Sequence, residues 1–133
     1  MAIKIKLIKN NIKRSSSYGK FFAKAVSQGE VSFDDIAAET CRRNGISEGT
    51  IHAVVTDMKD VVQRELCKGR TVVFPGLGRF SLRVESEGVD DPAKFSIRSH
   101  ITRILCGFLP SGHRGFHRQI TYEIGEGVKV EWA

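Results

Sequence analysis

The chain has 133 residues, 41% of them hydrophobic, and a formal net charge of +6. This length fits one domain with a modest core, and no stretch of roughly 18 apolar residues predicts a membrane-spanning helix. The three cysteines are odd in number and lack paired spacing, which excludes a disulfide framework or a C-x-x-C site and fits a reducing cytoplasm.

The charge is distributed unevenly along the chain. Residues 1–24 carry seven Lys or Arg and no acid, whereas residues 25–69 carry five basic and eight acidic residues. Residues 70–118 carry eight basic and four acidic residues, and residues 119–133 carry one and three. Two basic segments therefore flank a mildly acidic middle, which favours a polyanion as partner. The alternative is that these basic residues only solvate strand edges.

The first predicted element is a β-hairpin. Residues 2–9 alternate apolar side chains with lysines, which is a strand pattern and not the continuous apolar core of a signal peptide. A polar loop at 10–19 separates this strand from a second one at 20–28.

Two helices are expected next. Ser32, with an acid three residues later, can cap a helix that runs from about residue 33 to residue 43 and ends at Asn44-Gly45. Ser47 can start the second helix, whose apolar residues recur at helical spacing until Lys68-Gly69. We interpret this apolar stripe as core.

The remaining elements are mostly strands. Strands are expected at 71–75, 77–86 and 94–109, and they predict a long two-stranded arm with Pro92 between its strands. One face of the outgoing strand is dry and the other polar, and on the returning strand three basic residues share a parity: Lys94, Arg98 and His100. The tail is expected to form a helical turn at 111–118 and a last strand at 128–132.

Several motifs in one register connect these elements to a family. They are Gly45-Ile46-Ser47 between the helices, Lys68-Gly69 after the second helix, the turn from Pro75 to Phe80, Pro92 between the arm strands, and Phe108. With them, residues 32–111 resemble the HU and integration host factor family of bacterial histone-like DNA-binding proteins. The resemblance implies an α+β, intertwined homodimer with a two-helix body under a β-sheet saddle. It also implies extended β-arms that enter the minor groove and bend the duplex.

The resemblance also organises the chain. We expect a single HU-like domain over 1–133, with an N-terminal β-hairpin extension at 1–30, the HU-like core and arm at 31–111, and a divergent tail at 112–133. The hairpin stands where the family has a short N-terminus, as in HU-like variants with an N-terminal extension.

The tip of the arm departs from the family. Four acids lie near it, and two tip positions where the family commonly has arginine hold Glu85 and Gly88. Because phosphate contacts supply most of the affinity of sequence-neutral binding, these acids should repel the DNA backbone. We therefore expect the contact at the base of the arm.

The candidate DNA-binding residues are basic, with one proline that the resemblance assigns as a wedge between base pairs. They are Arg79, Arg83, Lys94, Arg98, His100 and Arg103 on the arm, Lys9, Lys13 and Arg14 in the hairpin, and Pro92. The hypothesis is a basic saddle that holds phosphates without reading bases. The alternatives are solvated strand residues and a simple turn proline.

No catalytic or metal site is expected. Cys106, His113 and His117 are the best metal candidates, but Gly115 interrupts their helix and no fourth ligand stands nearby. Gly76 and Gly78 lack the context of a phosphate loop, and no nucleophile and base are grouped. We expect no enzyme activity and no cofactor.

These observations lead to two functional hypotheses. The first is a cytoplasmic, nucleoid-associated homodimer that binds double-stranded DNA without sequence specificity and bends it, with no membrane or small-molecule partner. The second is a dimeric interaction or structural module that keeps the HU-like fold without tight DNA binding.

Overall fold

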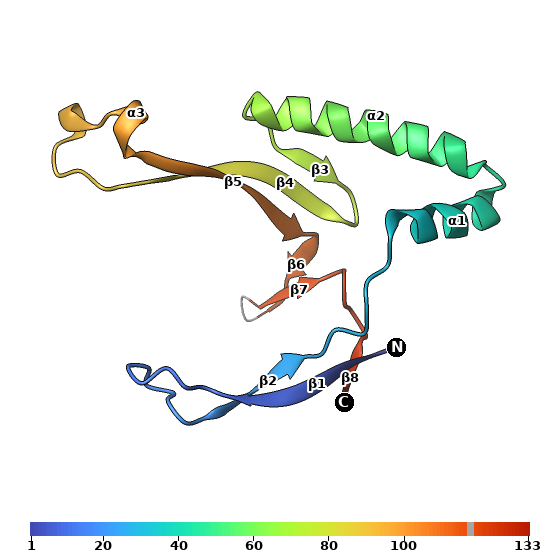
Figure 1. Cartoon of the computed structure of the whole chain (residues 1–133), viewed down its shortest axis with the longest axis horizontal. Coiled ribbons are helices and arrows are strands. Elements are labelled where there is room, and N and C mark those ends of the chain that lie inside the picture. Colours follow the sequence, from blue (N-terminus) through green and yellow to red (C-terminus); the bar gives the residue numbers. More distant parts are fainter. Residues whose placement is uncertain (117–118) are drawn as a thin grey trace. The chain divides into compact units, whose positions relative to one another are not determined.

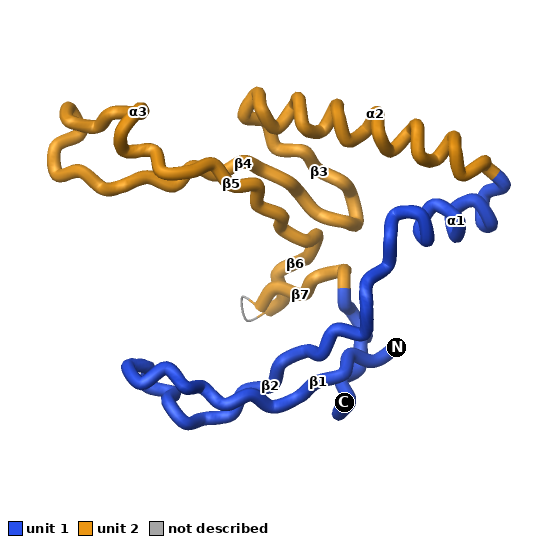
Figure 2. Tube along the Cα trace, in the orientation of Figure 1, with its two compact units in different colours: residues 1–45, 125–133 blue, residues 46–124 orange. Residues whose placement is uncertain are grey.

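The computed structural model describes residues 1–116 and 119–133, which form two compact units. Unit 1 comprises residues 1–45 and 125–133, and unit 2 comprises residues 46–124 (Figure 2). Compactness alone does not establish separate folding, so the expected single domain stays a prediction.

Unit 1 contains a three-stranded sheet in the order β2-β1-β8. Strand β1 (Ala2–Lys9) pairs antiparallel with β2 (Phe21–Ala25), so the expected hairpin is present, with a second strand shorter than 20–28. Strand β8 (Lys129–Trp132), expected from the sequence, pairs parallel with β1. The N-terminal and C-terminal segments therefore belong to one sheet.

Helix α1 (Phe33–Asn44) also belongs to unit 1 and has the caps that the sequence predicts. The Asp35 backbone N–H donates to the Ser32 hydroxyl at 3.2 Å, and the Ser32 N–H donates to the Asp35 carboxylate at 3.1 Å. The Ser32 hydroxyl also donates to the Asp35 carboxylate, at 2.7 Å, and the two hydrogen bonds that this carboxylate accepts from Ser32 lower the pKa of Asp35. Gly45 ends the helix in the left-handed region, at a φ of 69°.

Unit 2 begins with helix α2 (Glu48–Cys67), which is also capped as expected. The Thr50 N–H donates to the Ser47 hydroxyl at 3.2 Å. At the other end, the Glu65 carboxylate accepts from the Lys68 ammonium at 2.9 Å and from the Arg70 guanidinium at 2.8 Å. The Lys68 hydrogen bond, aided by Arg70, lowers the pKa of Glu65.

An antiparallel sheet in the order β3-β4-β5 lies beside α2 (Figure 1). Its strands are β3 (Val72–Phe74), β4 (Gly78–Ser86) and β5 (Ile101–Pro110). Gly76 turns the chain between β3 and β4 at a φ of 77°. A Cβ atom on Gly78 would lie 2.4 Å from the Leu109 carbonyl oxygen. Glycine is therefore required at position 78 by close packing and favoured at position 76 by the backbone conformation.

The prediction of a continuous strand over 94–109 is wrong at its first seven residues. Instead, Pro92–Lys94 form the 3-10 helix η1 and Ile97–His100 form the short helix α3. The Asp91 carboxylate accepts from the Ala93 N–H at 3.0 Å, and His100 Nδ1 accepts from the Ser96 N–H at 2.8 Å. These side chains accept hydrogen bonds from backbone N–H groups that would otherwise need a partner on a neighbouring strand.

The helical turn expected at 111–118 is also wrong where the structure describes it. Strand β6 (Gly112–Arg114) pairs antiparallel with β7 (Ile120–Tyr122). A Cβ atom on Gly112 would lie 2.5 Å from the Thr121 carbonyl oxygen, so glycine permits this close pairing. Residues 117–118 of the expected turn lie outside the described residues.

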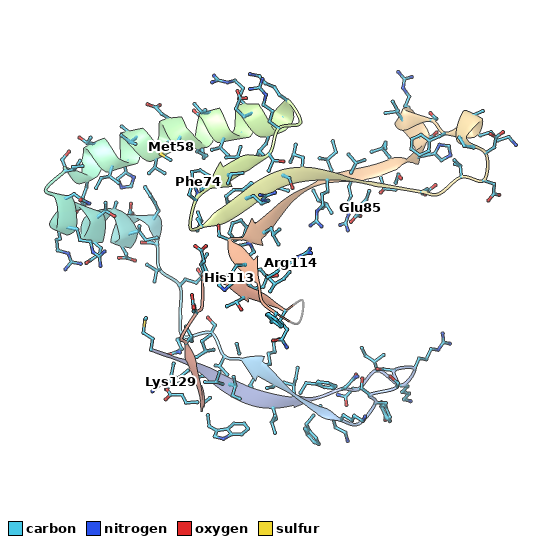
Figure 3. All side chains as sticks on the ribbon, turned by 180° about the vertical axis from the view of Figure 1, so that it is seen from behind. Met58, Phe74, Glu85, His113, Arg114 and Lys129 are labelled. Carbon is cyan, nitrogen blue, oxygen red and sulfur yellow. The ribbon has the colours of Figure 1, made fainter. Side chains whose placement is uncertain are left out.

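The core is small. Among the described residues, the buried apolar side chains are Ala37 and Leu66. In unit 2, α2 packs against β3 and β4, with Met58 beside Phe74 (Figure 3). The Phe80 ring lies 6.0 Å from Phe74 and 4.8 Å from Phe108. So little burial offsets only part of the entropy lost on folding.

No helix in the described part of the chain has both the length and the apolar character needed to cross a bilayer.

Candidate nucleic-acid interface

The arm consists of β4, β5 and the tip, residues 87–100, that joins them. Its strand register separates a polar face from a dry one, as expected for β4. The polar face carries Arg79, Ser81, Arg83 and Glu85 opposite Leu109, Gly107, Leu105 and Arg103. The dry face carries Phe80, Leu82 and Val84 opposite Phe108, Cys106 and Ile104.

The base of the polar face is hollowed. A hollow of about 250 Å³ is lined by Arg79, Ser81, Arg83, Gly107, Phe108 and Leu109. Two guanidinium groups and one hydroxyl supply hydrogen-bond donors, and none of the described lining residues is acidic. Such a donor set matches the oxygens of a phosphate group.

Gly107 makes room for one of these arginines. A Cβ atom at this position would lie 2.9 Å from Nε of Arg83, so the arginine side chain extends over the glycine. The sequence reasoning missed both Gly107 and Ser81. An isolated glycine within a strand is itself a signal of close approach, and it could have identified Gly107.

A second hollow, of about 340 Å³, adjoins Arg79 on the side of β6. Its lining includes Glu123, so Arg79 lies near a carboxylate in this direction. Arg83 lines the first hollow and not the second, and its side chain lies over Gly107. Because Glu123 would repel an anion near Arg79, an anion should bind more favourably near Arg83.

Arg103 is on the same face but is already paired. Its guanidinium donates to both oxygens of the Glu85 carboxylate, at 2.5 and 3.2 Å (Figure 3 labels Glu85). Both side chains are exposed, so the pair contributes little to stability. Its larger effect is to neutralise Arg103, which the sequence analysis counted as available.

The tip places the other predicted arm residues differently from the expectation. Lys94 lies on η1, and Arg98 and His100 lie on α3, so the strand parity that grouped them does not exist. The His100 ring stacks on Phe95 with centroids 5.3 Å apart, which gives it a structural role. Pro92 is the first residue of η1.

The tip also exposes an apolar side chain that the sequence reasoning missed. Ile97, the first residue of α3, is 79% exposed.

The predicted hairpin residues belong to unit 1 and are exposed. Lys9 ends β1 opposite Phe21, whereas Lys13 and Arg14 lie in the loop between β1 and β2. This loop is held by Asn10, which donates its N–H to the Lys20 carbonyl and accepts from the Gly19 N–H, both at 2.9 Å.

The metal candidates are spread over separate elements. Cys106 lies in β5 and His113 in β6, while His117 lies outside the described residues. Within the described ranges no three His, Cys, Asp or Glu side chains are grouped to hold an ion. The expectation of no metal site stays a prediction.

Comparisons with known proteins place the chain in a family. No curated protein matches it. A crystal structure from Bacteroides vulgatus, described as a "Putative bacterial DNA binding protein", has a similar fold, with a TM-score of 0.59 and 17% identity over 81% of this chain. The match covers 41% of that protein's length. The family model described as "HU domain fused to wHTH, Ig, or Glycine-rich motif" matches residues 1–111, including the N-terminal hairpin, and the chain therefore belongs to this HU-HIG family.

Proposed function

We propose that this protein is a homodimer that binds double-stranded DNA through its phosphates, without reading sequence, and bends it. The observation that carries the proposal is the hollow at the arm base, where Arg79, Ser81 and Arg83 offer donors without an acid in the described lining. Membership of a family named for its HU domain, and a structural neighbour described as DNA-binding, support the same reading.

Contacts of this kind position DNA but carry no sequence information. The guanidinium groups of Arg79 and Arg83 lie on one face of the paired strands, where they can meet phosphate oxygens. Neutralising phosphates on one side of a duplex also lowers the cost of curving it toward that side. The binding should therefore be sequence-neutral and should bend the duplex.

The homodimer is supported by apolar surface that unit 2 leaves open. Between α2 and β3 lies a hollow of about 400 Å³, lined by Met58, Val61, Val62, Val72 and Phe74, with Asp57 as its one charged residue. The dry face of the arm is exposed at Leu82, Val84 and Ile104. A second copy of unit 2 supplies matching apolar surface and would give each chain the core that it lacks alone.

The proposal extends to cellular location, cofactors and catalysis. A DNA-binding protein of this family would work on the bacterial nucleoid in the cytoplasm. It would need no cofactor and carry out no catalysis.

A salt titration tests the proposal. Binding to a random-sequence duplex should weaken steeply with salt, by a slope of about −0.9 per phosphate contacted. The double variant Arg79→Ala/Arg83→Ala should flatten the slope by about two contacts. The matched control is Arg42→Ala/Arg43→Ala on α1, which removes the same charge at residues paired with Glu39. No binding of the wild type at low salt would sink the proposal.

A second candidate function is a dimeric interaction module without tight DNA binding. It is favoured by the Glu85–Arg103 pair and by the acids of the tip, which reduce the positive charge of the arm. This candidate predicts a dimer by sedimentation together with no duplex binding at low salt.

A further inference from the structure

The alternation of apolar residues and lysines along β1 extends over the whole sheet of unit 1, which has two chemically different faces. Pairing of β1 with β2 and β8 gathers small and apolar side chains on one face, with Lys9 at its end. The small and apolar residues of this face are Ile3, Ile5, Leu7, Phe21, Ala23, Ala25, Val130 and Trp132. The other face holds four lysines, Lys4, Lys6, Lys24 and Lys129, together with Ala2, Ile8, Phe22 and Glu131 (Figure 3 labels Lys129). These are called the apolar face and the basic face.

The apolar face is open to solvent. Phe21 is 63% exposed and Trp132 is 68% exposed, and Ile3, Leu7 and Val130 are also exposed. A sheet normally packs one such face against a second layer. Within unit 1, no second layer covers this face to the point of burying any of its large side chains.

We propose that the apolar face packs against the same face of a second copy of this chain, as a two-layer β-sandwich. Apart from Lys9 at its end, the face carries no charge to pair with a charged partner, so the complement must itself be apolar. The identical face of a second copy meets this need under two-fold symmetry. Sheets stacked this way lie about 10 Å apart, and the four lysines of each basic face stay in solvent on the outside.

The size of the face fits a contact between chains that are already joined. Its exposed side chains amount to roughly 500 Å² per sheet, somewhat below the roughly 800 Å² that each partner gives to a standard interface. Such a contact is weak between free molecules. It becomes effective when another interface holds two copies together, because the second sheet is then present at a high local concentration. The inference rests on the proposed function only for this joining of two unit 2 copies.

Trp132 is the only tryptophan in the chain, so its fluorescence reports on this face directly. In the wild-type dimer the emission maximum should be blue-shifted and the indole shielded from iodide quenching. Dilution to monomer should red-shift the emission in step with dissociation by sedimentation. Exposed emission in the undiluted dimer, or shielding that persists in a monomer, would overturn the proposal, since the face would then be open or covered by its own chain.

A pair of neighbouring variants provides the matched control. Leu7→Lys places a charge on the apolar face, and Ile8→Lys places the same charge on the basic face of the same strand, at residues 52% and 42% exposed. Leu7→Lys should abolish the shielding of Trp132, and Ile8→Lys should leave it unchanged. Equal effects of the two substitutions would contradict the sandwich. If Leu7→Lys fails to fold by circular dichroism, Phe21→Ser makes the same test from β2.

The design separates this inference from the proposed function. If Leu7→Lys exposes Trp132 while the chain remains dimeric and binds duplex, the sandwich is supported as a surface separate from the DNA contact. If the wild type binds no DNA but Trp132 is shielded only in the dimer, the sandwich stands and the DNA proposal fails. If DNA binds while Trp132 is exposed in the dimer, the sandwich fails alone.

Discussion

The base and the tip of the arm carry similar basic residues but use them differently. At the base, Arg79 and Arg83 line an open hollow, and Gly107 provides space for the Arg83 side chain. Toward the tip, polar groups serve the fold itself: Glu85 holds Arg103, and His100 accepts from the Ser96 N–H. The comparison teaches that a count of positive residues overstates the charge available to a ligand, because hydrogen bonds within the arm occupy part of it.

The largest expected effect comes from reversing one charge in each region. Arg83→Glu should weaken binding to random duplex by about tenfold or more at low salt, since it removes a phosphate contact and adds repulsion. Arg98→Glu, on α3, should cost clearly less because the tip is expected to lie off the DNA. Fluorescence anisotropy with one labelled duplex measures both variants. Equal losses would abolish the distinction between base and tip.

The next effect tests the glycine under Arg83. Gly107→Ala puts a methyl group 2.9 Å from Nε, and the flexible arginine should move aside while the strand remains paired. We expect several-fold weaker binding and a small change in Tm, because moving the end of an exposed arginine costs the fold little. The matched control is Gly88→Ala at the tip, where the added Cβ would meet nothing within 4 Å. If Gly107→Ala binds duplex as the wild type does, the position of the Arg83 side chain over Gly107 does not contribute to DNA binding.

Releasing Arg103 should have the opposite sign. Glu85→Ala removes the carboxylate that pairs with Arg103 and should strengthen duplex binding, with a salt slope steeper by about one contact. Glu87→Ala is the control for charge alone, since it removes one negative charge from the neighbouring tip and leaves the Glu85–Arg103 pair intact. Only a gain larger for Glu85→Ala than for Glu87→Ala supports the release of Arg103.

Much of the scaffold could be predicted from the sequence because its signals are local. Ser32 and Ser47 cap their helices with their own side chains, and Gly45 takes the left-handed conformation that ends α1. The turn before β4 needs Gly76 and Gly78, so the family motif there has a steric basis. Alternation along residues 2–9 likewise specifies a strand without reference to its neighbours.

The failures arose where a non-local or competing contact decides. Residues 94–100 have strand-like parity, but Asp91 and His100 accept backbone hydrogen bonds that favour two helical turns. The pairing of Arg103 with Glu85 depends on the register across the arm, and the place of Val130 and Trp132 on the apolar face of unit 1 depends on a strand pairing over more than 120 residues. Side-chain spacing within one segment carries none of this information.

The smallest effect on DNA binding is expected from the tip's own fold. Asp91→Ala removes the acceptor for the Ala93 N–H and should destabilise η1 locally by about 1 kcal/mol, typical of a lost cap. Amide hydrogen exchange should rise over residues 92–100, while duplex affinity at the base should stay within about twofold, because loss of the acid and loosening of the tip leave Arg83 in place. A large loss of affinity together with faster exchange would mean that the folded tip itself holds DNA, and the comparison of base and tip would have to be reversed.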